Sequence, residues 1–349
     1  MNIPQDELEV AAIDARSNIT NTWQMLLGIG QTSSTVNRVR LSKSSVPFTL
    51  ITGFLGAGKT TLLNNLLSEP QRRRIAVIVN DFGSINIDAA LVDQDRSTAT
   101  SLQLENGCVC CTLAAGLLGT LVQLLTADTP PDHIVLEASG IAEPMGITQT
   151  ILGRPELELS GVVCVVDAEA VQAHLSIPNV GATIERQVQF ADLIVLNKTD
   201  LVGEDQLHSV RDWLGRSATR ASIIATTRSA LPADIVLGFR GGSRFLADEP
   251  HGDLFESVSL STDLILDERR ILDFGCEMPT GVLRAKGLLR LPDNLHRRAL
   301  FEFVGRRWSI RKDASNMEGL TSNLVVIGLK GSIDVAELNR KFTSCVVDQ

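Results

Sequence analysis

The sequence predicts an α/β fold in which a nucleotide-binding domain with a mainly parallel sheet is followed by a smaller α+β carboxy-terminal domain. Three observations support this prediction. A glycine-rich loop with a phosphate-binding pattern lies between a strand-like and a helix-like segment, nearly continuous apolar runs recur after it, and the composition changes near residues 238–250. With 349 residues, the chain is also long enough for about two domains.

The glycine-rich loop is the strongest motif. It reads Gly-Phe-Leu-Gly-Ala-Gly-Lys-Thr over residues 53–60, after the β-branched run 46–52 and before a segment at 60–67 with helical spacing of leucines. In a P-loop NTPase, such a loop wraps nucleotide phosphates with its backbone N–H groups at a helix N-terminus. Lys59 is expected to contact the β- and γ-phosphates and assist catalysis, and Thr60 to ligate Mg²⁺. The expected nucleotide contacts come from Gly53, Gly56, Ala57, Gly58, Lys59, Thr60 and Thr61. A glycine-rich turn that merely contains these residues is the alternative.

Further apolar runs predict the remaining strands of a buried parallel sheet, at residues 75–79, 134–136, 161–166 and 193–196. Helix-like segments at 113–126 and 183–191 lie between them, as crossover helices do in α/β domains. We expect this domain to occupy residues 47–240. Ligands collect at the carboxyl ends of parallel strands, and polar residues follow these strands at 80–81, 137, 167 and 197–200.

A second domain is expected at residues 251–349. The stretch 238–250 is rich in Gly, Arg, Ser and Asp and is typical of a linker. After it, the pattern predicts an antiparallel sheet with two helices and no catalytic motif. The strands are expected near 255–260, 282–291, 301–310 and 324–329, and the helices near 267–274 and 334–345. Residues 1–46 are predicted to be an amino-terminal extension, partly mobile.

The motif Asn197-Lys198-Thr199-Asp200 indicates which base is bound. A carboxylate at Asp200 can accept hydrogen bonds from guanine N1–H and the exocyclic amine, which adenine lacks. Asn197, Lys198 and Asp200 are therefore predicted to bind the nucleotide, with GTP favoured over ATP. An ordinary polar loop is the alternative.

Two acids follow predicted strands. Glu137, in Glu-Ala-Ser-Gly, is expected to polarise water or the metal's shell and is a predicted catalytic residue. A helix-capping or solvated glutamate is the alternative. Asp81 is a weaker candidate for a similar role or for metal binding, with an ordinary turn residue as its alternative.

Cys108, Cys110 and Cys111 place three thiols within four positions. Cys108 and Cys110 fall on one side of an extended segment, and Cys111 turns toward the helix that follows. Three thiolates suit a thiophilic ion such as Zn²⁺, Co²⁺ or Cu⁺ and leave a fourth position for another ligand. Buried thiols that pack as small hydrophobes and a redox couple remain alternatives. Cys164 lies inside a predicted buried strand and is expected to belong to the core, whereas Cys276 and Cys345 are isolated in the second domain. None of these three cysteines receives a role.

Charge and hydropathy exclude some classes of function. The formal net charge of −9 argues against nucleic acid as a partner. The start of the chain is acidic and lacks the pattern of a secretory signal. No run approaches the roughly 18 apolar residues of a membrane helix, so a membrane association is not expected. These features favour a cytoplasmic location.

With these motifs together, the chain resembles the CobW family of P-loop GTPases, metallochaperone-like relatives of the urease and hydrogenase maturation GTPases. The second domain also resembles the family's carboxy-terminal domain, and the similarity runs from about residue 47 to the end. The matching segments are 53–64, 105–113, 137–140, 197–200, 283–287, 306–308 and 325–328.

The resemblance implies a slow GTPase in which GTP binding and hydrolysis gate the transfer of Zn²⁺, Co²⁺ or another transition metal to a client protein. It implies metal binding by Cys108, Cys110 and Cys111, phosphate and Mg²⁺ contacts by Lys59 and Thr60, and a Walker-B-like acid at Glu137. Where the family usually has Asn-Glu-Phe-Gly-Glu, residues 80–84 read Asn-Asp-Phe-Gly-Ser. This departure leaves the fourth metal ligand and the metal preference open.

Other functions stay open. A nucleotide-regulated scaffold could activate a client enzyme through its second domain, with structural cysteines. A kinase could use the same phosphate loop, although the guanine-type motif disfavours it. The oligomeric state is also open, with a nucleotide-dependent homodimer among the options.

Overall fold

The computed structural model describes residues 45–68, 74–79, 99–103, 111–218, 220–238, 254–292, 299–312 and 321–347. Within these ranges only the backbone is described at 99–103, 111–115 and 312. Ser44–Gln349 belong to one compact unit. The expected extension at 1–46 lies almost wholly outside the described residues. The expected linker is described only at Gly238, so the domain boundaries stay a prediction.

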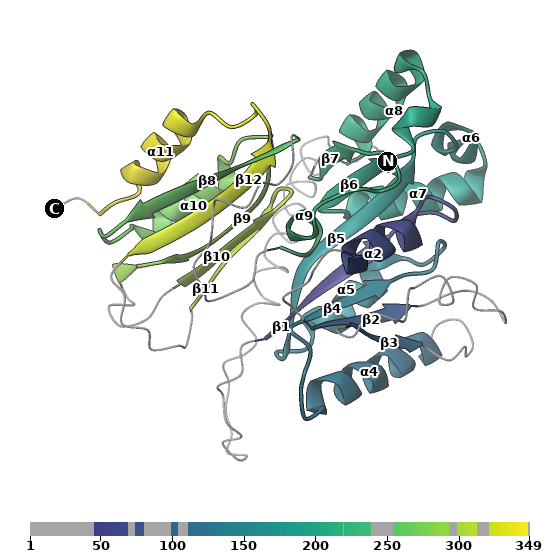
Figure 1. Cartoon of the computed structure of the whole chain (residues 1–349), viewed down its shortest axis with the longest axis horizontal. Helices are drawn as coiled ribbons and strands as arrows, with labels where there is room; N and C mark the ends of the chain where they lie inside the picture. Colours follow the sequence, from purple (N-terminus) through teal and green to yellow (C-terminus); the bar gives the residue numbers. More distant parts are fainter. Residues whose placement is uncertain are drawn as a thin grey trace, which may run out of the picture. The chain divides into compact units, whose positions relative to one another are not determined.

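The first sheet confirms the predicted α/β fold (Figure 1). Seven strands in the described ranges form a wholly parallel sheet in the order β3-β2-β4-β1-β5-β6-β7. They are β1 (Val46–Thr52), β2 (Ile75–Val79), β3 (Ala99–Gln103), β4 (His133–Glu137), β5 (Leu157–Asp167), β6 (Leu193–Asn197) and β7 (Ser222–Ala225). Strands β3 and β7 were not predicted from the sequence. Both are edge strands, which need not be apolar on both faces and so lack a continuous apolar run.

Helices cover both faces of this sheet (Figure 1). Alternate strand residues point to opposite faces. On one face, leucines of α2 (Lys59–Ser68) and apolar residues of α9 (Ala233–Leu237) pack with Val77, Val163 and Val195. The other face is covered by α4 (Cys111–Thr126), α5 (Pro144–Leu152), α7 (Pro178–Phe190) and α8 (Glu204–Ser217). The remaining short helices are α6 (Val171–Leu175) and the 3₁₀ turn η1 (Thr199–Leu201).

The second sheet is antiparallel, as predicted, in the order β11-β10-β9-β12-β8. Its strands are β8 (Phe255–Thr262), β9 (Val282–Leu289), β10 (Ala299–Val304), β11 (Arg307–Lys312) and β12 (Ser322–Leu329). Apolar residues of α10 (Glu268–Cys276) and α11 (Val335–Ser344) pack with it in one core.

One predicted strand is wrong. The run 301–310 was expected to be a single strand, but it is a hairpin of β10 and β11 with Val304 paired to Arg307. Gly305 adopts φ +60° between them, a conformation that glycine adopts at little cost and that reverses the chain.

Within the described residues, no helix has the length and apolar character needed to cross a membrane.

Candidate nucleotide site

The phosphate loop connects β1 to α2 with the backbone that its glycines permit. Gly53, Gly56 and Gly58 have φ of +133°, +73° and +109°. A Cβ on Gly53 would lie 2.2 Å from the carbonyl oxygen of Val165, and one on Gly58 would lie 2.4 Å from Nδ2 of Asn197. Glycine is therefore required at these two positions by both conformation and space. The loop ends where α2 begins at Lys59, so a helix N-terminus faces the loop.

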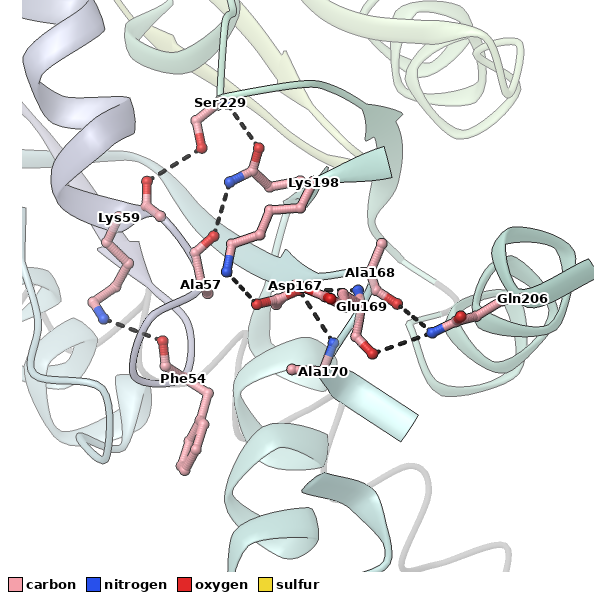
Figure 2. A network of polar contacts seen from close by, with 12 residues as sticks. Phe54, Ala57, Lys59, Asp167, Ala168, Glu169, Ala170, Lys198, Gln206 and Ser229 are labelled. Carbon is pink, nitrogen blue, oxygen red and sulfur yellow. Dashed lines mark hydrogen bonds and ion pairs between the residues drawn. The ribbon is translucent and has the colours of Figure 1, made fainter. Parts of the chain in front are cut away.

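Lys59 is only 8% exposed and lies within the loop (Figure 2). Its Nζ donates to the carbonyl oxygen of Phe54 at 3.3 Å. The ammonium group is thus held where the loop curves.

Thr60 and Glu137 meet although they are distant in sequence. The hydroxyl of Thr60 donates to Oε1 of Glu137 at 2.8 Å. The parallel pairing of β1 with β4 places Glu137 beside Ile51, directly before the loop. Glu137 is only 3% exposed. Hydroxyl and carboxylate oxygens are the hard ligands that Mg²⁺ prefers, so these two residues fit the expected ion.

Asn197 connects the base motif to the phosphate loop. Its Nδ2 donates to the carbonyl oxygen of Ala57 at 2.9 Å, and its Oδ1 accepts the backbone N–H of Ser229 at 2.7 Å. The hydroxyl of Ser229 in turn donates to the carbonyl oxygen of Gly58 at 3.2 Å. The buried Asn197 side chain therefore joins the phosphate loop to the loop after β7.

The other members of the motif lie beside it. Lys198 has φ +61°, and its Nζ forms an ion pair with Oδ2 of Asp167 at 2.5 Å (Figure 2). Oδ1 of Asp167 accepts the backbone N–H groups of Glu169 and Ala170, which orients the carboxylate. Asp200 lies in η1 and is exposed, so its carboxylate is accessible to a ligand.

Sequence reasoning missed the loop after β7. Arg228 and Ser229 have φ of +54° and +53°, a left-handed conformation that non-glycine residues seldom adopt. Asn65 of α2 donates to the carbonyl oxygens of both, at 2.8 and 3.1 Å. The short polar sequence Thr-Thr-Arg-Ser at 226–229 contains no motif that indicates this contact.

The expected metal ligands lie largely outside the described residues. This holds for Cys108, Cys110 and Asp81. Cys111 is the first residue of α4, two positions before the predicted start of that helix, and its backbone alone is described. In the described part of the chain, no group of three or more His, Cys, Asp and Glu residues could hold a metal.

Comparisons with known proteins identify similar sequences. A model of the CobW/HypB/UreG nucleotide-binding domain matches residues 47–225, and a model of the cobalamin synthesis protein CobW carboxy-terminal domain matches residues 255–346. A zinc chaperone CobW from Sinorhizobium sp is 32% identical over 88% of this chain and 99% of its own length. Zinc chaperone YjiA from Escherichia coli strain K12 is 32% identical over 82% and 94%.

A third relative is matched over part of its length. The zinc-regulated GTPase metalloprotein activator 1 of Dictyostelium discoideum is 33% identical over 55% of this chain and 48% of its own length. Among solved structures, the Zn(II)-bound YjiA GTPase from E. coli is 27% identical, with coverage of 87% of this chain and 100% of that chain and a TM-score of 0.42.

Proposed function

Since the chain belongs to the CobW/HypB/UreG family, we propose that it is a GTP-hydrolysing metallochaperone that carries Zn²⁺ or Co²⁺ to a client protein. The observation that supports this most is the contact of Thr60 with Glu137 at 2.8 Å. It brings the predicted Mg²⁺ ligand and the predicted acid together at the end of the phosphate loop. Relatives named zinc chaperones support the metal part of the proposal.

In this proposal the loop residues bind and orient the nucleotide. The N-terminus of α2 and Lys59 neutralise phosphate charge, and Asp200 selects guanine. Thr60 and Glu137 would hold Mg²⁺, which when bound offsets the negative charge of the phosphates. Glu137 lies in a nearly water-free position, where a carboxylate acts more strongly on its neighbours than it would in water.

The cargo metal would bind to Cys108, Cys110 and Cys111. Because α4 begins at Cys111, this residue lies at a helix N-terminus, which favours the negative charge of a thiolate. The strand register also relates this segment to the nucleotide site. Val79 pairs with both Gln103 and Glu137, so β2, β3 and β4 end at the same edge of the sheet. The segment that leads to Asp81 therefore starts beside Glu137, and the segment that leads to the cysteines starts one strand further along the same edge.

A metal titration at several nucleotide states tests the proposal. We expect the full chain to hydrolyse GTP in preference to ATP and to bind one Zn²⁺, with an affinity that differs between GDP and a non-hydrolysable GTP analogue. Replacing Cys108, Cys110 and Cys111 together by serine should abolish tight binding and preserve GTP affinity. The exposed Cys276 provides the control, since Cys276→Ser should leave Zn²⁺ binding unchanged. Undiminished Zn²⁺ and Co²⁺ binding by the triple variant would disprove the metal assignment.

A further inference from the structure

A single glutamine lies on the buried face of α7. Gln187 is only 1% exposed, and Ile184 and Val188 on the same face are apolar. An apolar side chain of similar volume would fill this position without needing hydrogen bonds. Packing alone therefore does not explain why an amide side chain occupies this position.

Both N–H groups of the Gln187 amide serve one turn. Nε2 donates to the carbonyl oxygens of Gly140 and Ala142, each at 3.1 Å. A primary amide has two N–H donors, so two bonds use its full donor capacity. Oε1 is buried and has no hydrogen-bond partner among the described residues. Among the described residues, the Gln187 amide therefore forms hydrogen bonds through its N–H groups and not through its oxygen.

The phosphate loop contacts the same turn. The turn, residues 139–142, closes with a hydrogen bond of 2.9 Å from the backbone N–H of Ala142 to the carbonyl oxygen of Ser139. A Cβ on Gly140 would lie 2.6 Å from the backbone nitrogen of Leu55. Leu55 and Gln187 also line a common cavity beneath the phosphate loop. The turn is therefore held between the phosphate loop and α7.

We propose that Gln187 is a positioning residue for GTP hydrolysis, which holds the 139–142 turn against the phosphate loop and thereby orients the end of β4 that bears Glu137. This inference rests on the proposed GTPase function. The carbonyl and N–H of a trans peptide point in opposite directions. Fixing the carbonyl of Gly140 on α7 therefore directs the N–H of Ile141 away from α7. Without Gln187 this peptide is free to rotate, and a displacement of about 1 Å near reacting groups can lower a rate roughly 100-fold.

The test compares Gln187→Met with a matched control. Methionine keeps the volume and apolar stem of glutamine but has no N–H donor. Gln206 of α8 is the control, because its Nε2 also donates to two carbonyl oxygens of a turn, those of Ala168 and Glu169 at 3.3 and 3.1 Å (Figure 2). Three properties are measured on the full chain: the single-turnover rate of GTP hydrolysis, the affinity for a fluorescent GTP analogue, and hydrogen exchange of the peptide that contains residues 138–146.

Gln187→Met should lower the hydrolysis rate by about 10- to 100-fold. GTP affinity should remain within about twofold, because Gln187 donates to the turn and not to the loop that binds phosphate. Exchange at 138–146 should become faster in Gln187→Met and stay unchanged in Gln206→Met.

Three outcomes would overturn the inference: an unchanged exchange rate in Gln187→Met, an unchanged hydrolysis rate despite faster exchange, or a loss of affinity as large as the loss of rate. Failure of the proposed function is distinguishable from these. A parent chain that binds GTP without hydrolysing it would disprove the GTPase assignment, and the exchange measurement would still decide whether Gln187 holds the turn.

Discussion

At the scale of single residues, the cysteines differ in what their surroundings allow. Cys164 lies inside β5, where burial raises the pKa of its thiol from 9.0 to about 12, although the nearby Lys59 opposes the shift. Burial likewise raises the pKa of Cys345 to about 11. Both thiols therefore stay neutral near pH 7 and act as small apolar side chains, as expected for Cys164 from its place in an apolar run. Neither is suited to bind metal as a thiolate.

The raised pKa of Cys164 predicts a loss of stability at alkaline pH. Above pH 9 the thiol ionises in the unfolded chain, while the folded chain retains its proton up to about pH 12. The contribution of the neutral thiol to the free energy of unfolding is thus fully present below pH 9. As the pH rises above 9, this contribution decreases by up to about 1.4 kcal/mol per pH unit. The lysines and the other cysteines also titrate in this range, so the contribution of Cys164 is isolated by comparing the parent with a variant that lacks this thiol.

Urea unfolding between pH 8 and 10.5 measures this dependence. Cys164→Val should show a shallower decrease in the free energy of unfolding than the parent, and the exposed Cys276→Val should match the parent. Equal slopes for the parent and Cys164→Val would contradict the assigned burial effect.

At the scale of elements, the phosphate loop depends on two different properties of glycine. Gly53 has φ +133° and would place a Cβ 2.2 Å from the backbone oxygen of Val165. Gly56 has φ +73° but would place a Cβ in open space, with nothing within 4 Å. Gly53 therefore needs both its conformation and its missing side chain, whereas Gly56 needs its conformation alone.

Alanine substitution separates these two effects. Gly56→Ala should cost about 1–2 kcal/mol, the strain of a left-handed alanine. Gly53→Ala should cost clearly more and abolish nucleotide binding, because β1 must move away from β5 to relieve the clash. Urea unfolding and titration with a fluorescent GDP analogue measure both quantities, and equal effects of the two substitutions would refute the explanation.

At the scale of the whole molecule, the two sheets of the compact unit Ser44–Gln349 share polar contacts and one apolar cluster, to which the second sheet contributes Phe255, Leu283 and Ile327. Arg307 at the start of β11 forms a two-fold ion pair with Asp192 at 3.0 Å, and Asp192 also accepts the N–H of Val162 in β5. Arg284 of β9 donates to backbone oxygens of α9 and to that of Ser160. The loop after β7, whose Ser229 contacts Asn197, leads directly to α9. Through Arg284, the second sheet therefore binds the helix that follows this loop.

Removing Arg307 should weaken this junction. Arg307→Gln leaves the nearly buried carboxylate of Asp192 without its cation, and we expect a loss of about 1–2 kcal/mol, at the lower end for charged hydrogen bonds because Arg307 is partly exposed. Arg340 provides a matched control, since it forms an ion pair with Glu337 on the exposed surface of α11. Arg340→Gln should change stability little. If chemical unfolding gives the same midpoint for both variants, the ion pair of Arg307 does not stabilise the junction.

The sequence by itself determined the features that follow from local patterns. The glycines and lysine of the phosphate loop, the motif at 197–200 and the apolar runs that became β1, β2, β4, β5 and β6 are local, because backbone conformation and burial on both faces leave a direct trace in residue order. The same reasoning correctly assigned Cys164 to the core. It missed β3 and β7, and it joined β10 to β11 across Gly305, since edge strands and tight turns leave weaker traces.

The tertiary structure alone decided which of these residues meet. The bond from Thr60 to Glu137 joins positions 77 residues apart, and it depends on β4 lying beside β1, which strand order sets and periodicity does not encode. The same is true of Asn197, whose partners at Ala57 and Ser229 come from two other loops, and of Gln187, which looks like any polar residue in a helix until the 139–142 turn is placed next to it. Contacts between distant segments depend on topology and register, and so only the folded chain reveals them.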